Sequence, residues 1–252
     1  MGARILGLVC GLSVMVGTPA LADPRLDELV YSPYVNNHVF ELETRIGREI
    51  GAGSLKNAQT VINEAEYGFS DRLSVSLLTK VEQAPRETAR LAGVGIEGIY
   101  YLGQLPKISV DAGLYLEVTK GAGGVSDSSE AKLLLAKTAG RFQGLFNFII
   151  ERPFSGPQGE VFASYGYAAS ATWQTIGNLR LGGEAFGDVG DDRGLLNRPQ
   201  GAYLGPQLKW EGKPRFLPFE LEVDAGWLVT VGPDSHEASS QARVNLALER
   251  HF

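Results

Sequence analysis

The chain has 252 residues, of which 44% are hydrophobic and 21% charged, with a formal net charge of −6 and one cysteine. The length fits one domain, and the acidic balance argues against a nucleic-acid partner, which would need a basic face on the protein. A single cysteine excludes a disulfide within the chain, so the fold must close by backbone pairing and packing alone.

The first 22 residues have the pattern of a secretory signal peptide. Arg4 precedes an apolar run over residues 5–17, and the small-x-small triplet Ala20-Leu21-Ala22 follows. Cleavage is therefore expected after Ala22, which leaves residues 23–252 as the mature domain. A transmembrane anchor is the alternative, but the run is shorter than the roughly 20 residues that a spanning helix needs. A lipoprotein signal at Cys10 is not expected, because this cysteine lies inside the apolar run and lacks the small residues that precede a lipoprotein cysteine.

Alternation of apolar and polar residues with period 2 recurs through the rest of the chain. In the clearest segment, Leu221 and Val223 share one face, while Glu222 and Asp224 share the other. Such runs match the roughly 9–11 residues that a tilted strand needs to cross a membrane. Before the first strand, PRLDELVYS is a candidate for a short turn. The predicted strands lie at residues 38–46, 58–67, 72–82, 91–102, 107–119, 130–138, 141–151, 161–174, 179–187, 202–210, 216–232 and 241–252.

The connections between these strands alternate between short and long. Short ones include GFSD at 68–71, AGR at 139–141 and TIGN at 175–178, whereas KGAGGVSDSS at 120–129 and DVGDDRGLLNRPQ at 188–200 are long. A bacterial outer-membrane barrel has this pattern, with tight periplasmic turns, longer external loops and an even number of strands. A soluble sandwich gives no reason for its loop lengths to alternate.

We therefore predict an all-β fold, a single antiparallel up-and-down transmembrane β-barrel of about 12 strands, within a range of roughly 10–14. In hydrocarbon every backbone polar group must be paired within the protein, and strands achieve this only by closing on themselves. Apolar rows then face lipid and charged rows face the lumen. The side chains predicted to line the lumen are Glu64, Glu66, Lys80, Asp111, Glu117, Lys132, Arg180, Glu184, Lys209, Glu220, Glu222, Asp224 and Arg243.

Alternation alone also fits a soluble periplasmic ligand-binding barrel or sandwich. There the apolar face packs inside and the charged face meets water. The signal peptide, the alternating loop lengths and the terminal Phe252 favour the membrane barrel. The direction of Leu221, Val223 and Trp227 relative to the barrel axis decides between the two arrangements.

The chain ends in ARVNLALERHF, an alternating strand that stops on Phe252. This ending resembles the signal by which the outer-membrane assembly machinery recognises its clients, although Arg250 stands where that signal has an apolar or aromatic residue. The segments YSPYVNNHVFELETR and YGFSDRLSVSLLTKVE resemble those of uncharacterised proteobacterial outer-membrane barrels of the porin-like or transporter-like kind. The resemblance implies a place in the outer membrane of a Gram-negative bacterium, with membrane lipid and the assembly machinery as partners.

Few residues have the spacing of a catalytic or metal site. The segment DSHEASS places His236 beside serine and acidic residues, as a lipid-hydrolysing barrel with a His–Ser pair would require, but a solvated loop is the simpler interpretation. Asp188, Asp191 and Asp192 form an acidic loop that would suit a divalent cation, although their spacing is not that of an EF-hand. The sequence predicts no catalytic residue, resident metal or cofactor.

Together these features predict a non-enzymatic, porin-like channel that passes small solutes through an acidic lumen. A closed barrel with a structural or surface-interaction role is the alternative, because Lys80, Arg180 and Arg243 can pair with the carboxylates and fill a small barrel with side chains. A lipid-modifying enzyme around His236 and a soluble periplasmic ligand binder are the less favoured alternatives.

Overall fold

The computed structural model describes residues 26–154, 162–192, 194–195, 202–215, 217–232 and 239–252. The predicted signal peptide and its cleavage site after Ala22 lie outside these ranges. No helix within the described ranges is long and apolar enough to cross a membrane. The strands are β1 (Val39–Glu49), β2 (Gln59–Gly68), β3 (Leu73–Gln83), β4 (Arg90–Leu105), β5 (Val110–Gly121), β6 (Ser128–Ala139), β7 (Phe142–Pro153), β8 (Ser164–Gln174), β9 (Leu179–Asp191), β10 (Gly194–Leu195), β11 (Ala202–Gly212), β12 (Glu220–Val231) and β13 (Ser240–His251).

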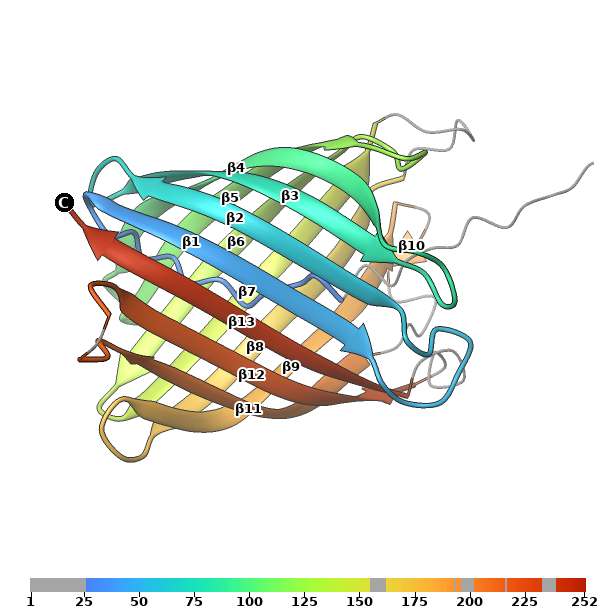
Figure 1. Ribbon diagram of the computed structural model, residues 1–252. Helices are drawn as coiled ribbons and strands as arrows, with labels where there is room; N and C mark the ends of the chain where they lie inside the picture. The colour runs from blue at the N-terminus through green and yellow to red at the C-terminus, as the bar shows by residue number, and fades with distance from the viewer. Residues whose placement is uncertain (1–25, 155–161, 193, 196–201, 216, 233–238) are drawn as a thin grey trace, which may run out of the picture.

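The strands form one closed antiparallel barrel (Figure 1). Each strand pairs with its neighbours in the chain, and β13 pairs with β1 to close the wall, from Val39 opposite His251 to Glu49 opposite Gln241. Strand β10 is a two-residue addition at the end of β9, so the wall itself has twelve strands. The predicted up-and-down barrel is confirmed, and each predicted strand corresponds to one strand of the wall.

The two ends of the barrel carry connections of different length. At the end that holds Val39 and Phe252, which we call the terminal end, the connections are residues 69–72, 106–109, 140–141, 175–178 and 213–219. Gly140 and Gly177 have positive φ angles of 61° and 57° in two of these turns, a backbone conformation that suits glycine. Longer connections, among them residues 50–58, 154–163 and 232–239, lie at the opposite end, the loop end. Most connections follow the predicted alternation of loop lengths. Residues 213–219 are the exception, because this terminal-end connection is longer than residues 84–89 and 122–127 at the loop end.

The wall has its apolar side chains on the outside. Leu116 and Trp227 are 64% and 55% exposed, whereas their neighbours in sequence Tyr115 and Leu228 are 1% and 0% exposed. Asp224 is buried on the inner face of the same strand as Trp227. This is the polarity of a membrane barrel, because a soluble barrel buries its apolar rows. The exposed apolar side chains include Leu42, Ile46, Leu77, Ile96, Leu114, Leu133, Phe146, Leu181, Leu204, Val229 and Leu246.

Residues 26–37, which we call the inner segment, run along the inside of the barrel toward the start of β1 (dark blue in Figure 1). The sequence predicted at most a short turn here. Twelve extended residues span up to about 40 Å, which is enough to traverse the cylinder. The inner segment has no regular strand or helix pairing, so its main chain depends on side chains for hydrogen bonds, as at Tyr31 with Asn147 and at Tyr34 with Ser32.

The inner segment packs against two apolar clusters inside the barrel. Val30 is buried with Leu145, Phe186 and Leu228, and Tyr31 joins the cluster of Ile99, Tyr115 and Leu134. Each fully buried side chain of this size contributes about 1.5–3 kcal/mol relative to an exposed one. The lumen is therefore partly filled by a core of its own.

Glycine in the wall lets the inner segment come close to it. A Cβ atom on Gly47 of β1 would overlap the carbonyl oxygen of Leu26, and one on Gly68 of β2 would overlap that of Asn36. The wall thus has glycine, which has no side chain, where the two ends of the inner segment lie against it.

Candidate functional site

Asn147 of β7 holds the main chain of the inner segment. Its Oδ1 accepts a hydrogen bond from the backbone N–H of Tyr31 at 2.7 Å, and its Nδ2 donates one to the carbonyl oxygen of Tyr31 at 2.9 Å. Asn147 is 0% exposed. The carboxamide therefore replaces both hydrogen bonds that a neighbouring strand would give this residue, and it fixes the inner segment in one register.

Two lysines of the wall pair with the acidic residues of the inner segment. Lys132 Nζ lies 2.6 Å from Glu28 Oε1 and 2.9 Å from Glu130 Oε1, and Lys80 pairs with Asp27 and, at 3.2 Å, with Glu82. Each ammonium, buried at Lys132 and partly buried at Lys80, thus lies between a carboxylate of the wall and one of the inner segment. Removing either lysine would leave its two carboxylates facing each other without a counter-charge, which is strongly unfavourable.

Aromatic residues continue these contacts toward the terminal end. Lys132 Nζ lies over the rings of Tyr31 and Tyr115, 4.6 and 4.7 Å from their centroids. Tyr34 donates a hydrogen bond to Asp111 Oδ2 at 2.9 Å, and Tyr101 donates one to Asp111 Oδ1 at 2.6 Å. Partial burial together with the bond to Asp111 raises the pKa of Tyr34 to about 12, so this phenol remains a donor at physiological pH.

The thirteen residues predicted to line the lumen all lie on the barrel strands, at the positions that alternate with the exposed apolar rows. Lys209 Nζ and Asp224 Oδ2 meet at 2.9 Å, and Gln207 donates to both Asp224 and Glu184, at 2.9 and 3.1 Å. Arg180 is separate from this group, because it donates to Thr172 and to the carbonyl of Arg141 near the terminal end.

Other predicted residues meet partners that the sequence did not indicate. Glu64 accepts a hydrogen bond from Arg45 at 2.8 Å, and Glu117 accepts bonds from Tyr115 and Thr119, at 2.5 and 2.6 Å. The remaining members of the set have weaker or indirect contacts. Glu66 contacts Ser76, Glu220 contacts His251, and Arg243 lies over the ring of Phe186.

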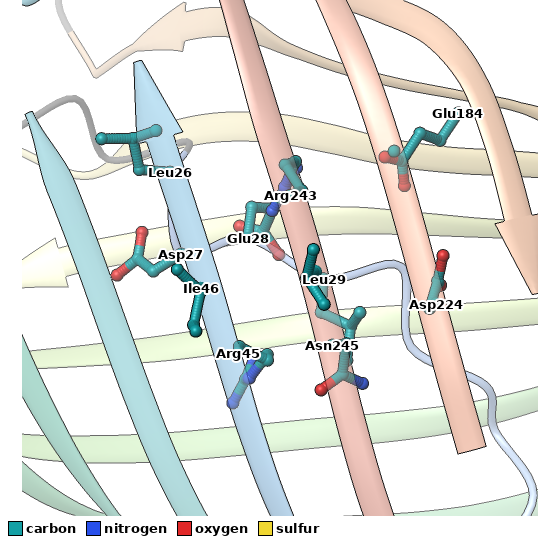
Figure 2. Close-up of a pocket in the computed structure, with 12 residues that line it drawn as sticks. Leu26, Asp27, Glu28, Leu29, Arg45, Ile46, Glu184, Asp224, Arg243 and Asn245 are labelled. Carbon is teal, nitrogen blue, oxygen red and sulfur yellow. The ribbon is translucent and has the colours of Figure 1, made fainter. Parts of the chain in front are cut away.

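A cavity remains between the inner segment and the wall formed by β1, β9, β12 and β13 (Figure 2). Its polar lining comes from Asp27 and Glu28 of the inner segment and from side chains of the wall, which are Arg45, Glu184, Asp224, Arg243 and Asn245. Within the part of the chain that the structure describes, Arg243 Nη1 is buried without a hydrogen-bond partner. The cavity therefore offers an unsatisfied donor beside carboxylates, a suitable environment for a water molecule.

Carboxylates face one another across neighbouring strands near the terminal end. Glu41 of β1 lies opposite Glu66 of β2 and Glu249 of β13, and Glu211 of β11 lies opposite Glu222 of β12. Like charges in directly opposite positions destabilise a sheet. Such an arrangement favours cations in the lumen, which would screen the repulsion.

The acidic loop predicted as a possible cation site is tied into the wall where it is described. Asp192 accepts hydrogen bonds from the backbone N–H of Ala163 at 3.0 Å and from the hydroxyl of Tyr165 at 2.6 Å. These two bonds hold the pKa of Asp192 below its ordinary value. Asp188 and Asp191 are not brought together with it into a metal-binding group in the described ranges. His236 lies outside the described residues.

Phe252 lies just beyond β13 at the terminal end. Its backbone N–H donates to the carbonyl oxygen of His38 at 3.0 Å, and its side chain is largely exposed. The last residue thus extends the seam between the first and last strands by one hydrogen bond. This position leaves the ring accessible.

Sequence reasoning did not find the residues that organise the interior: Asp27, Glu28, Tyr31, Arg45, Glu97, Tyr115 and Asn147. The alternation of apolar and polar residues places Arg45, Glu97, Tyr115 and Asn147 on the inner face, so the sequence did contain a signal for these four. Nothing comparable marks Tyr31, whose partner Asn147 is 116 residues away.

No protein-family model and no curated protein matches this sequence. Among solved structures, the chain is similar to the KdgM porin in complex with disordered oligogalacturonate, with a TM-score of 0.53 and 10% identity over 84% of this chain and 99% of that one. It is also similar to an outer membrane channel from Pseudomonas putida F1, with a TM-score of 0.56 and 12% identity over 91% and 99%. These likenesses concern the fold, and they agree with the resemblance to outer-membrane barrels.

Proposed function

We propose that this protein is a channel in the outer membrane of a Gram-negative bacterium, and that it passes small solutes with a preference for cations. The barrel fold, with its apolar exterior, supports the location, and structural relatives of this fold include a porin and a channel. We further propose that the assembly machinery reads the terminal strand through Phe252 and that passage involves no chemical step.

The observation that carries this proposal is the surplus of carboxylates on the inner face. Glu41, Glu66 and Glu249 face one another across strands near the terminal end, and Glu211 faces Glu222. A narrow passage with walls of low dielectric concentrates such a field, which attracts cations and repels anions. The name of the KdgM complex indicates a carboxylate-bearing ligand for that porin. The present lumen favours the opposite charge.

Passage would follow the side of the lumen that the inner segment leaves free. The cavity lined by Glu184, Asp224 and Arg243 lies on this side (Figure 2). The opposite side is filled by Tyr31 and its aromatic and lysine neighbours. A solute would therefore move between the inner segment and the β9–β12–β13–β1 wall, and the inner segment would limit its size.

Swelling of liposomes that contain the purified protein tests the charge preference. Lysine, glutamine and glutamate have similar sizes and different charges, so we expect uptake in the order lysine, glutamine, glutamate. Replacing Glu41 and Glu222 with glutamine should reduce the ratio of lysine to glutamate uptake. Glu87→Gln, in an exposed position at the loop end, is the matched control and should leave the ratio unchanged. Faster uptake of glutamate than of lysine would refute the cation preference.

A closed barrel with a structural role is the second candidate, and the inner segment favours it. Asn147, Lys80 and Lys132 fasten this segment inside the lumen through buried contacts. If the barrel is permanently closed, liposomes should not swell with any of the three solutes. The Asn147→Ala variant, which loosens the inner segment, should then be equally impermeable. Swelling in that variant would favour the channel.

A further inference from the structure

Three carboxylates converge on one point of the inner wall beneath Tyr31. Glu64 and Glu66 come from β2 and Glu97 comes from β4, and one oxygen atom from each lies within 4.8 Å of the other two. Glu64 and Glu97 are buried, and Glu66 is partly buried. Ser76 of β3 lies opposite both Glu66 and Glu97 in the strand register, so hydroxyl oxygen is present in the same place. We call these three glutamates the carboxylate triad.

One oxygen of the carboxylate triad is left without a protein partner. Glu97 is 2% exposed, and its Oε2 accepts hydrogen bonds from Tyr115 at 2.7 Å and from Tyr31 at 3.5 Å. Its Oε1 is buried, with no hydrogen-bond partner among the residues that the structure describes. A buried acceptor of this kind costs about 1–3 kcal/mol unless something binds it. The two phenols fix the carboxylate so that its free oxygen is available to the triad.

The protein does not supply enough positive charge for this group. Arg45 contacts Glu64 at 2.8 Å, but it is shared with Glu43, whose Oε1 lies 2.7 Å from its Nε. One guanidinium therefore serves two carboxylates, while Glu66 and Glu97 have only hydroxyl donors. Tyr115 also donates toward Glu117 at 2.5 Å, so its single proton is divided. Burying several uncompensated carboxylates is prohibitively unfavourable, so the group must either share protons among its members or bind a cation.

We propose that the carboxylate triad binds a divalent cation of the calcium type. Calcium takes oxygen ligands about 2.3–2.6 Å away, so oxygens on opposite sides of the ion are about 4.6–5.2 Å apart. Three oxygens within 4.8 Å of one another fit around such an ion. Ligands of this kind exclude soft metals, because the site offers no sulfur or imidazole. The site does not depend on whether solutes pass through the barrel.

The position of the triad joins the cation to the inner segment. Glu97 contacts Tyr31 of the inner segment, and Arg45 lies over the ring of Tyr31, 5.4 Å from its centroid. A bound cation would neutralise the wall behind Tyr31 and keep Arg45 between Glu43 and Glu64. The cation therefore strengthens the contact surface on which the aromatic part of the inner segment rests.

Terbium luminescence tests the proposal in the detergent-solubilised barrel. Terbium takes the place of calcium at oxygen sites and emits when a nearby tyrosine is excited, and Tyr115 lies in hydrogen-bond contact with Glu97. We expect saturable, tyrosine-sensitised emission that calcium displaces. Glu97→Gln should weaken terbium binding by about tenfold or more, the scale seen when groups around a metal are removed. Tyr115→Phe should reduce the emission more than it shifts the calcium competition.

Glu151→Gln is the matched control, because it removes an inner-face carboxylate of β7 that is not part of the triad. It should leave terbium binding within about twofold of wild type, well inside the tenfold scale above. Heat-modifiable mobility in gels verifies that each variant is folded. Equal terbium binding by Glu97→Gln and wild type would overturn the proposal. So would the absence of calcium-displaceable emission, because protons shared among the glutamates would then neutralise the group.

Discussion

Replacing Asn147 with alanine is the most informative perturbation of the inner segment. The substitution removes both hydrogen bonds to the main chain of Tyr31, at 2.7 and 2.9 Å, and leaves every charge in the lumen in place. Because alanine offers no polar group, the N–H and C=O of Tyr31 become unpaired in a buried position. The inner segment should then spend more time away from the wall.

The size of this effect follows from the two orphaned groups. Each buried backbone group without a partner costs about 1–3 kcal/mol, and water entering the space left by the carboxamide recovers part of that. A net loss of about 2–4 kcal/mol corresponds to roughly a 30-fold to several-hundred-fold rise in the displaced population, at about 1.4 kcal/mol per factor of ten. The substitution does not change the ion pairs of Lys80 with Asp27 and of Lys132 with Glu28. These pairs favour the return of the inner segment to the wall, so its displacement stays reversible.

A cysteine in place of Val30 reports the displacement. Val30 is buried, and the only native cysteine, Cys10, lies in the predicted signal peptide. The labelling rate of this cysteine with a water-soluble maleimide should therefore rise with the displaced population. We expect Val30→Cys to label slowly alone and roughly 30-fold faster or more when combined with Asn147→Ala, on the same free-energy scale.

Asn178→Ala is the control for this experiment. Asn178 is exposed, lies in a turn at the terminal end and donates to the carbonyl of Glu211 at 2.6 Å. It should leave the labelling of Val30→Cys unchanged. Equal labelling rates with Asn147→Ala and Asn178→Ala would refute the reasoning, because Asn147 would then not hold the inner segment.

Three further predictions concern the wall, its last residue and one loop. Leu116→Arg on the exposed apolar row should lower the free energy of unfolding in lipid vesicles by about 2–4 kcal/mol; a change no larger than that of Leu116→Phe would contradict the lipid-facing assignment. Phe252→Ala should reduce the amount of folded barrel in cells but not refolding in detergent, and equal cellular amounts would count against the assembly signal. The pKa of Asp192 is lowered by its two donors, so its stabilising effect should be complete above 3.8, the ordinary value of this group. It should be lost as the pH falls through the folded pKa; Asp192→Asn should show no such loss in acid unfolding curves.

The barrel was predictable because each strand repeats the same physical requirement. In β5 and β12, apolar and polar residues alternate over the whole width of the wall, since one face meets an apolar medium and the other does not. Errors are confined to strand ends. The strand predicted from residue 216 begins at Glu220, and Pro218 just before it has no N–H to pair with a neighbouring strand.

The interior was predictable only in part. Alternation assigns Glu97, Tyr115 and Asn147 to the inner face, but it carries no information about which of them meet. The inner segment makes its contacts one residue at a time with separate strands, so it leaves no periodic pattern in the sequence. Its hydrogen bond to Asn147 spans 116 residues, a distance over which local sequence rules do not reach.

Single-channel recording in a planar bilayer under a potassium chloride gradient tests the central claim most directly. The account predicts small conductance steps for the wild-type protein, with a reversal potential that shows cation preference. Asn147→Ala should give larger steps with the same preference, because the carboxylates of the wall remain when the inner segment moves. Two results would contradict the account: no steps from either protein, as a closed barrel requires, or a reversal potential that shows anion preference.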